Sequence, residues 1–207
     1  AAWYKMTSLI GRILGIEKET DEYVKTIQKT IEKNGIAVSL EEVAADEKSL
    51  WVAYSLTDEN DENDISMNSV QAAVDGEALA LERQYALNNS TGSEKTASKY
   101  FVAKFNRSKA DRSQKFEIEI GTFQNENGQV EEKDAYEFSF TADPEVLEAD
   151  TKEIDIQTSI PIEKNQTFLL SEMKYNIFGC TISGSFSDMA EDDEFWLRGK
   201  DDLGNEY

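Results

Sequence analysis

Two runs of alternating apolar side chains between Ile36 and Leu56 constrain the fold of this chain more than any other stretch. In the first run, every second residue as far as Leu40 is apolar. A polar break at residues 44–49 follows, and apolar residues then occupy every second position from Leu50 onward. The opposite face of the second run carries Trp51, Ala53 and Ser55. This period of two predicts a pair of antiparallel strands with one buried face.

The composition is that of a globular chain with a substantial core. Of its 207 residues, 39% are hydrophobic and only two are proline, and the aromatic residues comprise ten Phe, eight Tyr and three Trp. A chain of this length buries roughly 70% of the surface that it exposes when unfolded. We therefore expect one large β domain or two small ones, and not a disordered chain.

The charge is strongly acidic, with 42 Asp and Glu against 21 Lys and Arg and a formal net charge of −21. Nucleic acids bind clustered Lys and Arg, and anionic membrane surfaces attract basic segments, so the charge excludes both classes of partner. An acidic surface favours solubility, which is the simplest interpretation. A cationic partner or a divalent ion is the alternative.

The chain contains no histidine, and Cys180 is its only cysteine. It therefore has no intrachain disulfide and no Cys–His pair. It also lacks the side chain that most often serves as a general base or as a metal ligand. The apolar neighbours of Cys180 predict a small buried side chain.

Residues 1–33 are predicted to be helical and to lead into the β domain. Apolar residues from Trp3 to Leu14 fall near a spacing of three and four. A second stripe at the same spacing consists of Tyr23, Val24, Ile27 and Ile31. Asn34-Gly35 then supplies a C-terminal stop for the helix.

The rest of the chain is predicted to be all-β, in immunoglobulin-like sandwich units. Asp75-Gly76 is a strong hairpin signal, and Asp143-Pro144 ends the last strand of a first series. The expected domains are a helical lead-in at 1–33, a β-sandwich domain at 34–147 and a second β-sandwich unit at 148–207. The sequence stops where the partner of the final turn is due, so the second unit is either incomplete or shares a sheet with the first.

Asp58, Asp61 and Asp64 lie in an acidic run, and they are the candidate metal ligands. Closely spaced carboxylate oxygens are what Ca²⁺ takes in proteins. The run lacks the alternating ligands, the glycine and the terminal glutamate of a calcium-binding loop. We therefore predict a solvated loop, with no metal site and no cofactor.

No catalytic constellation is found in the sequence. Glu117 and Glu119 are carboxylates about 7 Å apart on one strand face. Glycosidases use such pairs, but the alternation with apolar residues predicts an ordinary solvent-facing strand. Ser171 and Lys174 match a spacing found in penicillin-binding enzymes, but their strand-like pattern points the two side chains to opposite faces. The chain is predicted not to be an enzyme.

Two tryptophans are the candidate ligand-binding residues. Trp51 lies on the second face of its predicted strand, and Trp196 lies beside an acidic loop. Exposed aromatic rings at these positions would suit a carbohydrate ligand. Packing in the core or between sheets is the preferred interpretation of both.

Residues 14–56, the hairpin at 74–79 and the ending DDLGN at 201–205 together resemble a domain of unknown function. This domain is found outside the membrane in anti-sigma factors and related proteins of Gram-positive, spore-forming bacteria. In that family, a cytoplasmic sigma-binding segment and one membrane helix precede the β domain. The sigma-binding segment is missing here, and the family supplies no functional residue. The start at Ala1-Ala2, without Met, leads us to expect a fragment.

The resemblance implies a non-catalytic sensing or interaction module of a membrane-anchored regulator, located outside the cytoplasm. Its expected partner is an extracytoplasmic protein or a cell-wall ligand, and its expected link to the membrane is an anchor absent from this sequence. The alternative is a secreted or lipid-anchored surface protein that acts as an adhesin, a spacer or a carbohydrate-binding module. A membrane helix upstream favours the regulator, whereas a signal with a lipobox cysteine favours the surface protein.

Overall fold

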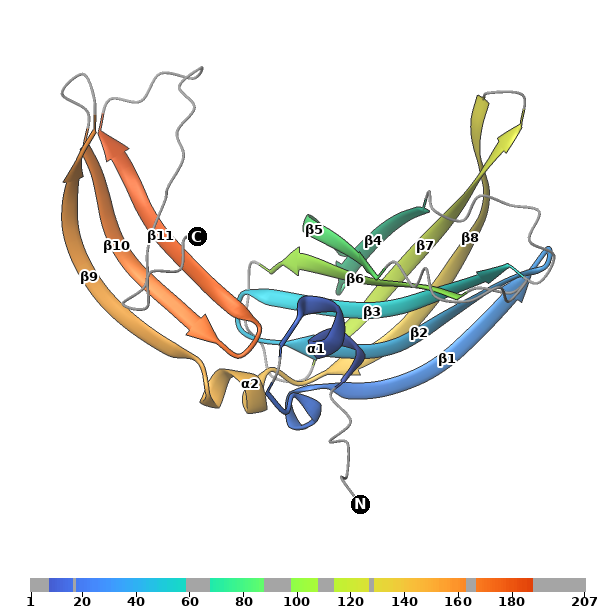
Figure 1. Ribbon diagram of the computed structural model, residues 1–207, viewed down its shortest axis with the longest axis horizontal. Coiled ribbons are helices and arrows are strands. Elements are labelled where there is room, and N and C mark those ends of the chain that lie inside the picture. Colours follow the sequence, from blue (N-terminus) through green and yellow to red (C-terminus); the bar gives the residue numbers. More distant parts are fainter. Residues whose placement is uncertain are drawn as a thin grey trace. The chain divides into compact units, whose positions relative to one another are not determined.

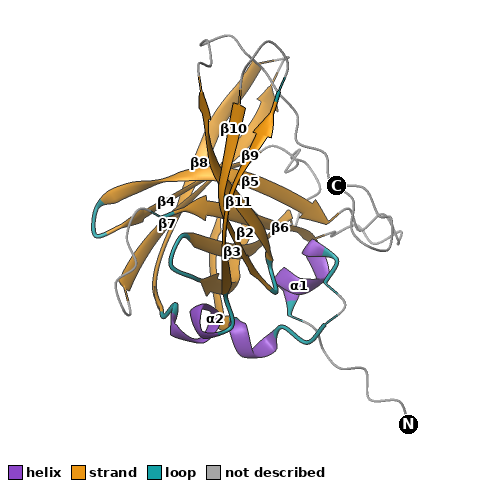
Figure 2. Cartoon of the chain, turned by 90° about the vertical axis from the view of Figure 1, so that its left-hand side faces the viewer, coloured by secondary structure: helices purple, strands orange, loops and turns teal. Residues whose placement is uncertain are grey.

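The computed structural model describes residues 8–16, 18–58, 68–87, 98–107, 114–126, 129–162 and 167–187. The chain divides into two compact units. The first comprises residues 1–151 together with 176–179, and the second comprises 152–175 and 180–207. Strands predominate over helices among the described residues (Figure 2), so the all-β prediction is confirmed.

The elements of the first unit follow the chain from blue to yellow in Figure 1. In chain order they are α1 (Leu9–Leu14), the 3-10 helix η1 (Asp21–Tyr23), β1 (Lys25–Lys33), β2 (Ile36–Ala45), β3 (Ser49–Asp58), β4 (Asn68–Val74), β5 (Glu77–Leu87), β6 (Ser98–Asn106), β7 (Gln114–Glu126), β8 (Gln129–Ala142) and α2 (Glu145–Ala149).

The strands of the first unit form one eight-stranded sheet in the order β1-β2-β3-β6-β5-β4-β7-β8. β5 joins the two halves of the sheet, because residues 77–79 pair with β4 whereas residues 80–87 pair with β6. The sheet folds over at this strand, and the two inner faces share one core. A single sheet that curls toward a barrel does not confirm the predicted immunoglobulin-like sandwich.

The core between the inner faces is rich in aromatic side chains. Tyr54 and Tyr136, which come from opposite halves of the sheet, are both fully buried. The rings of Tyr54 and Phe101 stack with their centroids 5.3 Å apart, and those of Phe116 and Phe140 stack at 5.5 Å. Burial of a large apolar side chain contributes roughly 1.5–3 kcal/mol, so this core is the main source of stability.

The strand pair predicted between Ile36 and Leu56 is confirmed as β2 and β3. The two strands are antiparallel, and Val38 lies opposite Leu56 while Leu40 lies opposite Tyr54. The prediction of one buried face is wrong for β3, because every residue of this strand except Thr57 is buried. A second layer must therefore cover its outer face.

That second layer is formed by α1, α2 and the segment 176–179. The buried members of this outer core are Leu9, Ile10, Ala44, Trp51, Ala53, Val102 and Leu147, with Ile177 and Phe178 packed against them. Figure 1 shows α1 lying across the face of β3. The apolar stripe of α1 thus has the outer face of the sheet as its partner.

The prediction of a helix throughout residues 1–33 is wrong, because Lys25–Lys33 is strand β1. Ile27 and Ile31 lie four residues apart, a spacing that fits one face of a helix and also one face of a strand. Asn34 and Gly35 both have positive φ angles, of 51° and 79°. They form a tight hairpin turn between β1 and β2, with Lys33 paired to Ile36, and do not end a helix.

The second unit has a three-stranded antiparallel sheet in the order β11-β10-β9, formed by β9 (Lys152–Pro161), β10 (Thr167–Asn176) and β11 (Gly179–Ser187). The rings of Phe168 and Phe186 pack with centroids 4.6 Å apart. A Cβ atom on Gly184 would lie only 2.3 Å from the Phe168 ring, so this position needs glycine. Cys180 is exposed, so the prediction of a buried cysteine is wrong.

The predicted boundary between residues 147 and 148 falls inside α2 (Glu145–Ala149). The first unit extends as far as Thr151 and also includes residues 176–179. The ending at 201–205 lies outside the described residues. In the part of the chain that the structure describes, no helix has the length and apolar character needed to span a membrane.

Candidate functional site

The structure removes Trp51 from the candidates for a ligand surface. Only 3% of Trp51 is exposed, and its ring lies 5.3 Å from that of Phe178. The ammonium group of Lys104 sits 5.7 Å from the centroid of the Trp51 ring. Trp51 is therefore a packing residue of the outer core. Trp196, the other candidate, lies outside the described residues.

The candidate calcium ligands do not form a site in the described structure. Asp58 is the last residue of β3 and only 5% of it is exposed. Asp61 and Asp64 lie outside the described residues. Among the residues that are described, no group of three carboxylate or cysteine side chains is arranged to hold a metal ion.

Ser171 and Lys174 both lie on β10 and make separate contacts. The Ser171 hydroxyl donates to the Ser183 carbonyl at 2.9 Å. The Lys174 ammonium pairs with the Glu153 carboxylate at 3.0 Å. The two side chains are thus held by different neighbours.

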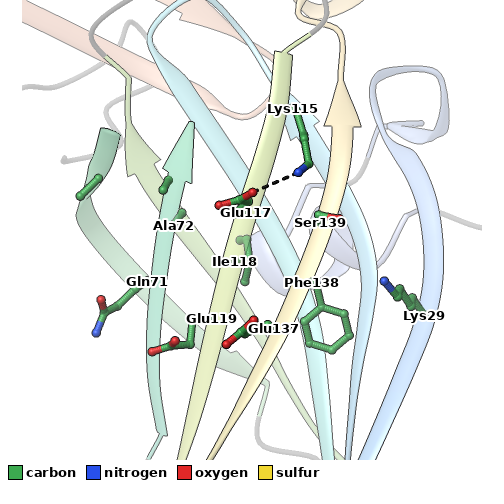
Figure 3. Close-up of a pocket in the computed structure, with 12 residues that line it drawn as sticks. Lys29, Gln71, Ala72, Lys115, Glu117, Ile118, Glu119, Glu137, Phe138 and Ser139 are labelled. Carbon is green, nitrogen blue, oxygen red and sulfur yellow. Dashed lines mark hydrogen bonds and ion pairs between the residues drawn. The ribbon is translucent and has the colours of Figure 1, made fainter. Parts of the chain in front are cut away.

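A pocket of about 480 Å³ lies on the outer face of the first unit (Figure 3). Its lining crosses from β4 and the start of β5 over β7 and β8 to β1. The lining residues are Lys29, Gln71, Ala72, Ala73, Ala78, Lys115, Glu117, Ile118, Glu119, Glu137, Phe138 and Ser139. Carboxylates and lysines thus share one concave surface.

The sheet register places the polar side chains of this pocket in rows. One row is Gln71, Glu119 and Glu137, which lie directly opposite one another on β4, β7 and β8. In the next row, Glu117 lies opposite Ser139. The prediction that Glu117 and Glu119 share an outward face is confirmed, because Phe116, Ile118 and Ile120 between and beside them are buried.

Glu119 and Glu137 form a pair of like charges across neighbouring strands. Figure 3 shows the two carboxylates side by side at one end of the pocket. The Lys115 ammonium pairs with Glu117 at 3.1 Å, whereas Glu119 and Glu137 have no ion pair with any described residue. Like charges directly opposite each other in a sheet are destabilising. This end of the pocket therefore has a local excess of negative charge.

The pocket reaches the gap between β1 and β8, which are the two edge strands of the sheet. At one end of this gap, the Lys25 ammonium donates to the Thr141 carbonyl at 2.8 Å and to the Thr141 hydroxyl at 3.1 Å. At the other end, the Lys33 ammonium donates to the Ala135 carbonyl. We call the stretch between these two lysine contacts the seam. Side chains bridge its ends, whereas no backbone pairing joins β1 to β8 among the described residues.

The lysine contacts show to which side the backbone N–H and C=O groups of β8 point. The carbonyls of Ala135 and Thr141 both point toward β1, since they accept hydrogen bonds from its lysines. Residues two apart in a regular strand present their N–H and C=O groups to the same side. The backbone groups of Glu137 and Ser139 therefore also face the seam.

Both ends of the seam are fixed by further hydrogen bonds. The Tyr136 hydroxyl donates to the Lys33 carbonyl at 3.1 Å, and the Asn34 amide donates to Asp134 at 2.9 Å. Beyond the other end, the Tyr23 hydroxyl donates to the Asp150 carboxylate. That hydrogen bond is the main cause that raises the pKa of Tyr23 to about 12.

A partly buried polar cluster lies around Tyr54, away from the pocket. The Tyr54 hydroxyl donates to the Asn68 side-chain oxygen at 2.6 Å, and the Gln84 amide donates to both of these oxygens. Burial raises the pKa of Tyr54 well above its usual range. The three side chains are held by hydrogen bonds to one another, so the cluster has a structural role.

The sequence contains only part of the signal for this site. It places Glu117 and Glu119 on one face, because the alternation from 116 to 120 is unbroken. It does not reveal the seam, because the seam exists only if residues 25–33 form an edge strand. The sequence NG at 34–35 is the signal that identifies this strand, since it is typical of a tight hairpin.

Comparison with known proteins shows a similar fold and, for the first part of the chain, similarity to a domain of unknown function. No curated protein matches the chain. The chain is similar to the crystal structure of the conserved domain protein from Bacillus anthracis, with a TM-score of 0.56 and 18% sequence identity. The match covers 78% of this chain and 54% of that one, so this chain spans about half the length of its structural relative. At this identity the likeness shows the fold alone.

The family comparison covers the N-terminal part of the chain. Residues 2–58 match a domain of unknown function, DUF4179. The described part of this match contains α1, η1 and β1–β3, and so one edge of the seam and the part of the outer core that comes from α1, β2 and β3. The predicted resemblance to a domain of unknown function is confirmed for these residues, and the family describes what this part of the chain is similar to.

Proposed function

We propose that this chain is a non-catalytic sensing or interaction module that is held outside the cell membrane as part of a membrane-anchored regulator of the anti-sigma type. The observation that carries the interaction role is the seam, where an unpaired sheet edge adjoins an acidic pocket. Edge strands are sites at which other chains add to a sheet, and natural proteins usually cover or block them.

The regulatory context is supported by the match of residues 2–58 to a domain of unknown function. The sequence resembles the extracytoplasmic part of membrane-anchored anti-sigma factors in the same region. The sequence also lacks histidine and any recognised catalytic motif, which favours binding over catalysis as the role.

The location is testable through the exposed thiol of Cys180. Intact cells that express the full-length protein are treated with a membrane-impermeant maleimide, and the labelled protein is then recovered. Labelling in intact cells is the expected result, and labelling only after lysis contradicts the proposed location. A Cys180→Ser variant reports any label on cysteines elsewhere in the full-length protein.

The regulatory role is testable with a promoter read by the cognate sigma factor. Removing residues 8–187 from the full-length protein, with any upstream segments left in place, is expected to change the activity of that promoter. An unchanged response across growth and cell-envelope stress contradicts the role as a sensing module. Abundance of the truncated protein, measured by immunoblot, serves as the control.

A further inference from the structure

Along the seam, β8 presents an unpaired backbone edge over a length that suits pairing with one more strand. From Ala135 to Thr141, β8 covers about 20 Å at roughly 3.4 Å per residue. Between the lysine contacts at its two ends, the backbone groups of Glu137 and Ser139 face the gap. β1 lies near this edge of β8, but in the described structure no strand pairs with these groups.

The conformation of β1 explains why the sheet does not close here. Gln28 has a positive φ of 50°, and the pairing of β1 with β2 shifts in register between Thr26 and Lys29. Such a bulge bends a strand and interrupts its pairing. β1 is therefore bent at the middle of the seam, opposite the exposed backbone of β8, while Lys25 and Lys33 hold its ends.

The charges around the seam select the kind of strand that fits. Glu137 lies on β8 itself, and Glu119 lies directly opposite it on β7. A cationic side chain on an added strand, next to Glu137, would lie within reach of this carboxylate pair. Lys29 already supplies a positive charge to the pocket from the β1 side. The cationic side chain of an added strand is therefore expected on the β8 side, next to Glu137.

We propose that the seam binds an extended, cationic segment of a partner protein, which adds a strand to the edge of β8 and places a Lys or Arg beside Glu137. Backbone hydrogen bonds to Glu137 and Ser139 provide affinity, and the carboxylates provide the preference for a basic segment. This inference rests on the proposed interaction role and names the class of partner.

A second copy of this chain fits the seam less well. Two β8 edges paired antiparallel would bring acidic side chains together, and the β1 edge is protected by its own lysines, at positions 25, 29 and 33. The net charge of −21 also opposes self-association and favours a basic partner.

The test uses three synthetic peptides and the chain as it stands. The first peptide alternates Lys and Val, the second has Glu in place of Lys, and the third has a central proline that removes a backbone donor. Fluorescence anisotropy measures their binding, and hydrogen exchange measures protection of the amides of Glu137 and Ser139. We expect binding of the first peptide only, with protection of these two amides.

Two charge-reversal variants separate a specific site from general attraction. Glu137→Lys changes the seam, and Asp155→Lys makes the same change in net charge on an exposed position of β9 in the second unit. Glu137→Lys is expected to weaken binding by about tenfold or more. Asp155→Lys is expected to change binding by less than about twofold, because Asp155 is not part of the seam and a single charge outside the site contributes only screened, general attraction. Unchanged circular dichroism shows that each variant is folded.

Four results overturn the inference. The first is that the Lys peptide does not bind, and the second is that Glu137→Lys and Asp155→Lys weaken its binding equally. The third is that the peptide binds without protecting the amides of Glu137 and Ser139 from hydrogen exchange. The fourth is that this chain forms a dimer, which Glu137→Lys dissociates. The last result assigns the edge to a second copy. Labelling of Cys180 in intact cells does not depend on Glu137, so a chain that is labelled but does not bind the peptide keeps its proposed location and loses only this inference.

Discussion

The ring of Trp51 packs against that of Phe178 with the centroids 5.3 Å apart and the planes at 42°. Trp51 belongs to β3, and Phe178 belongs to the segment 176–179, which returns to the first unit from much later in the chain. The contact ties this segment to the outer core, where Lys104 also lies over the Trp51 ring. Aromatic pairs of this kind stabilise a fold beyond the area that they bury.

Replacing Phe178 with alanine is expected to lower the free energy of unfolding by about 2 kcal/mol, because a half-buried ring is lost from a packed core. Urea denaturation followed by tryptophan fluorescence measures the change. Ile182→Ala is the control, since this side chain is 44% exposed and its loss is expected to cost less than about 0.5 kcal/mol. Equal losses in both variants contradict a specific role for the Trp51–Phe178 contact.

The outer core also shows which parts of the fold are predictable from sequence. The alternation from Ile36 to Leu56 predicts β2 and β3 correctly, because a period of two over two runs has few alternative explanations. The preferred interpretation of Trp51 as a packing residue is confirmed, but the alternation does not identify the layer that covers it, because burial of that face depends on α1. The helical stripe of α1 is visible in the sequence, but the surface that it covers is fixed only by tertiary packing.

The error in residues 25–33 has a different origin. Ile27 and Ile31 fit a helix and a strand equally well, so periodicity alone does not decide between them. Asn34-Gly35 ends a helix in one interpretation and closes a hairpin in the other. The β-branched residues of this segment, at positions 26, 27, 30 and 31, favour the strand. Because β1 forms one edge of the seam, a prediction that makes residues 25–33 a helix also misses the seam.

The Asn34-Gly35 turn gives a direct test of that assignment. Gly35 has a φ of 79°, a conformation that costs most L-residues roughly 1–2 kcal/mol. Gly35→Val is therefore expected to lower the free energy of unfolding by about that amount or more. Gly35→Asn is expected to cost less, because asparagine adopts positive φ more readily. Equal stability of the two variants in urea denaturation contradicts a tight hairpin turn at this position.

Burial of Tyr54 predicts a pH dependence of stability. Its pKa in the folded chain is raised above the ordinary value of about 10, mainly because burial disfavours the charged phenolate. In the unfolded chain, Tyr54 loses its proton near pH 10, so alkaline pH stabilises the unfolded state. The contribution of Tyr54 is fully present below about pH 10 and decreases as the pH rises above it.

Tyr54→Phe is expected to remove part of this alkaline loss. At neutral pH the variant loses about 1 kcal/mol, since a buried hydrogen bond to Asn68 is no longer made. Denaturation curves at about pH 8 and about pH 10.5 are compared for the two proteins. The variant is expected to show a smaller drop between the two pH values. Tyr175→Phe is the control, since Tyr175 is 37% exposed. An identical drop in wild type and Tyr54→Phe contradicts the burial effect.

The like-charge pair in the pocket predicts a substitution that stabilises the fold. Glu119 and Glu137 lie directly opposite each other, and neither has an ion pair with a described residue. Glu137→Gln keeps the shape of the side chain and removes one charge, so it is expected to raise the free energy of unfolding by about 0.5 kcal/mol at low salt. The gain is expected to shrink in 1 M salt, where the Debye length is about 3 Å.

Glu117→Gln is the matched control, because Glu117 is one row away and pairs with Lys115 at 3.1 Å. Its expected effect is zero or a small loss, since exposed ion pairs contribute little. If both variants gain equally, the effect is a general reduction of negative charge and not the relief of one pair. If only Glu137→Gln gains, and the same change weakens binding of a basic peptide, then the carboxylate pair lowers stability and serves recognition. That combination ties the charge at the seam to function, because packing alone gives no reason to place two carboxylates opposite each other.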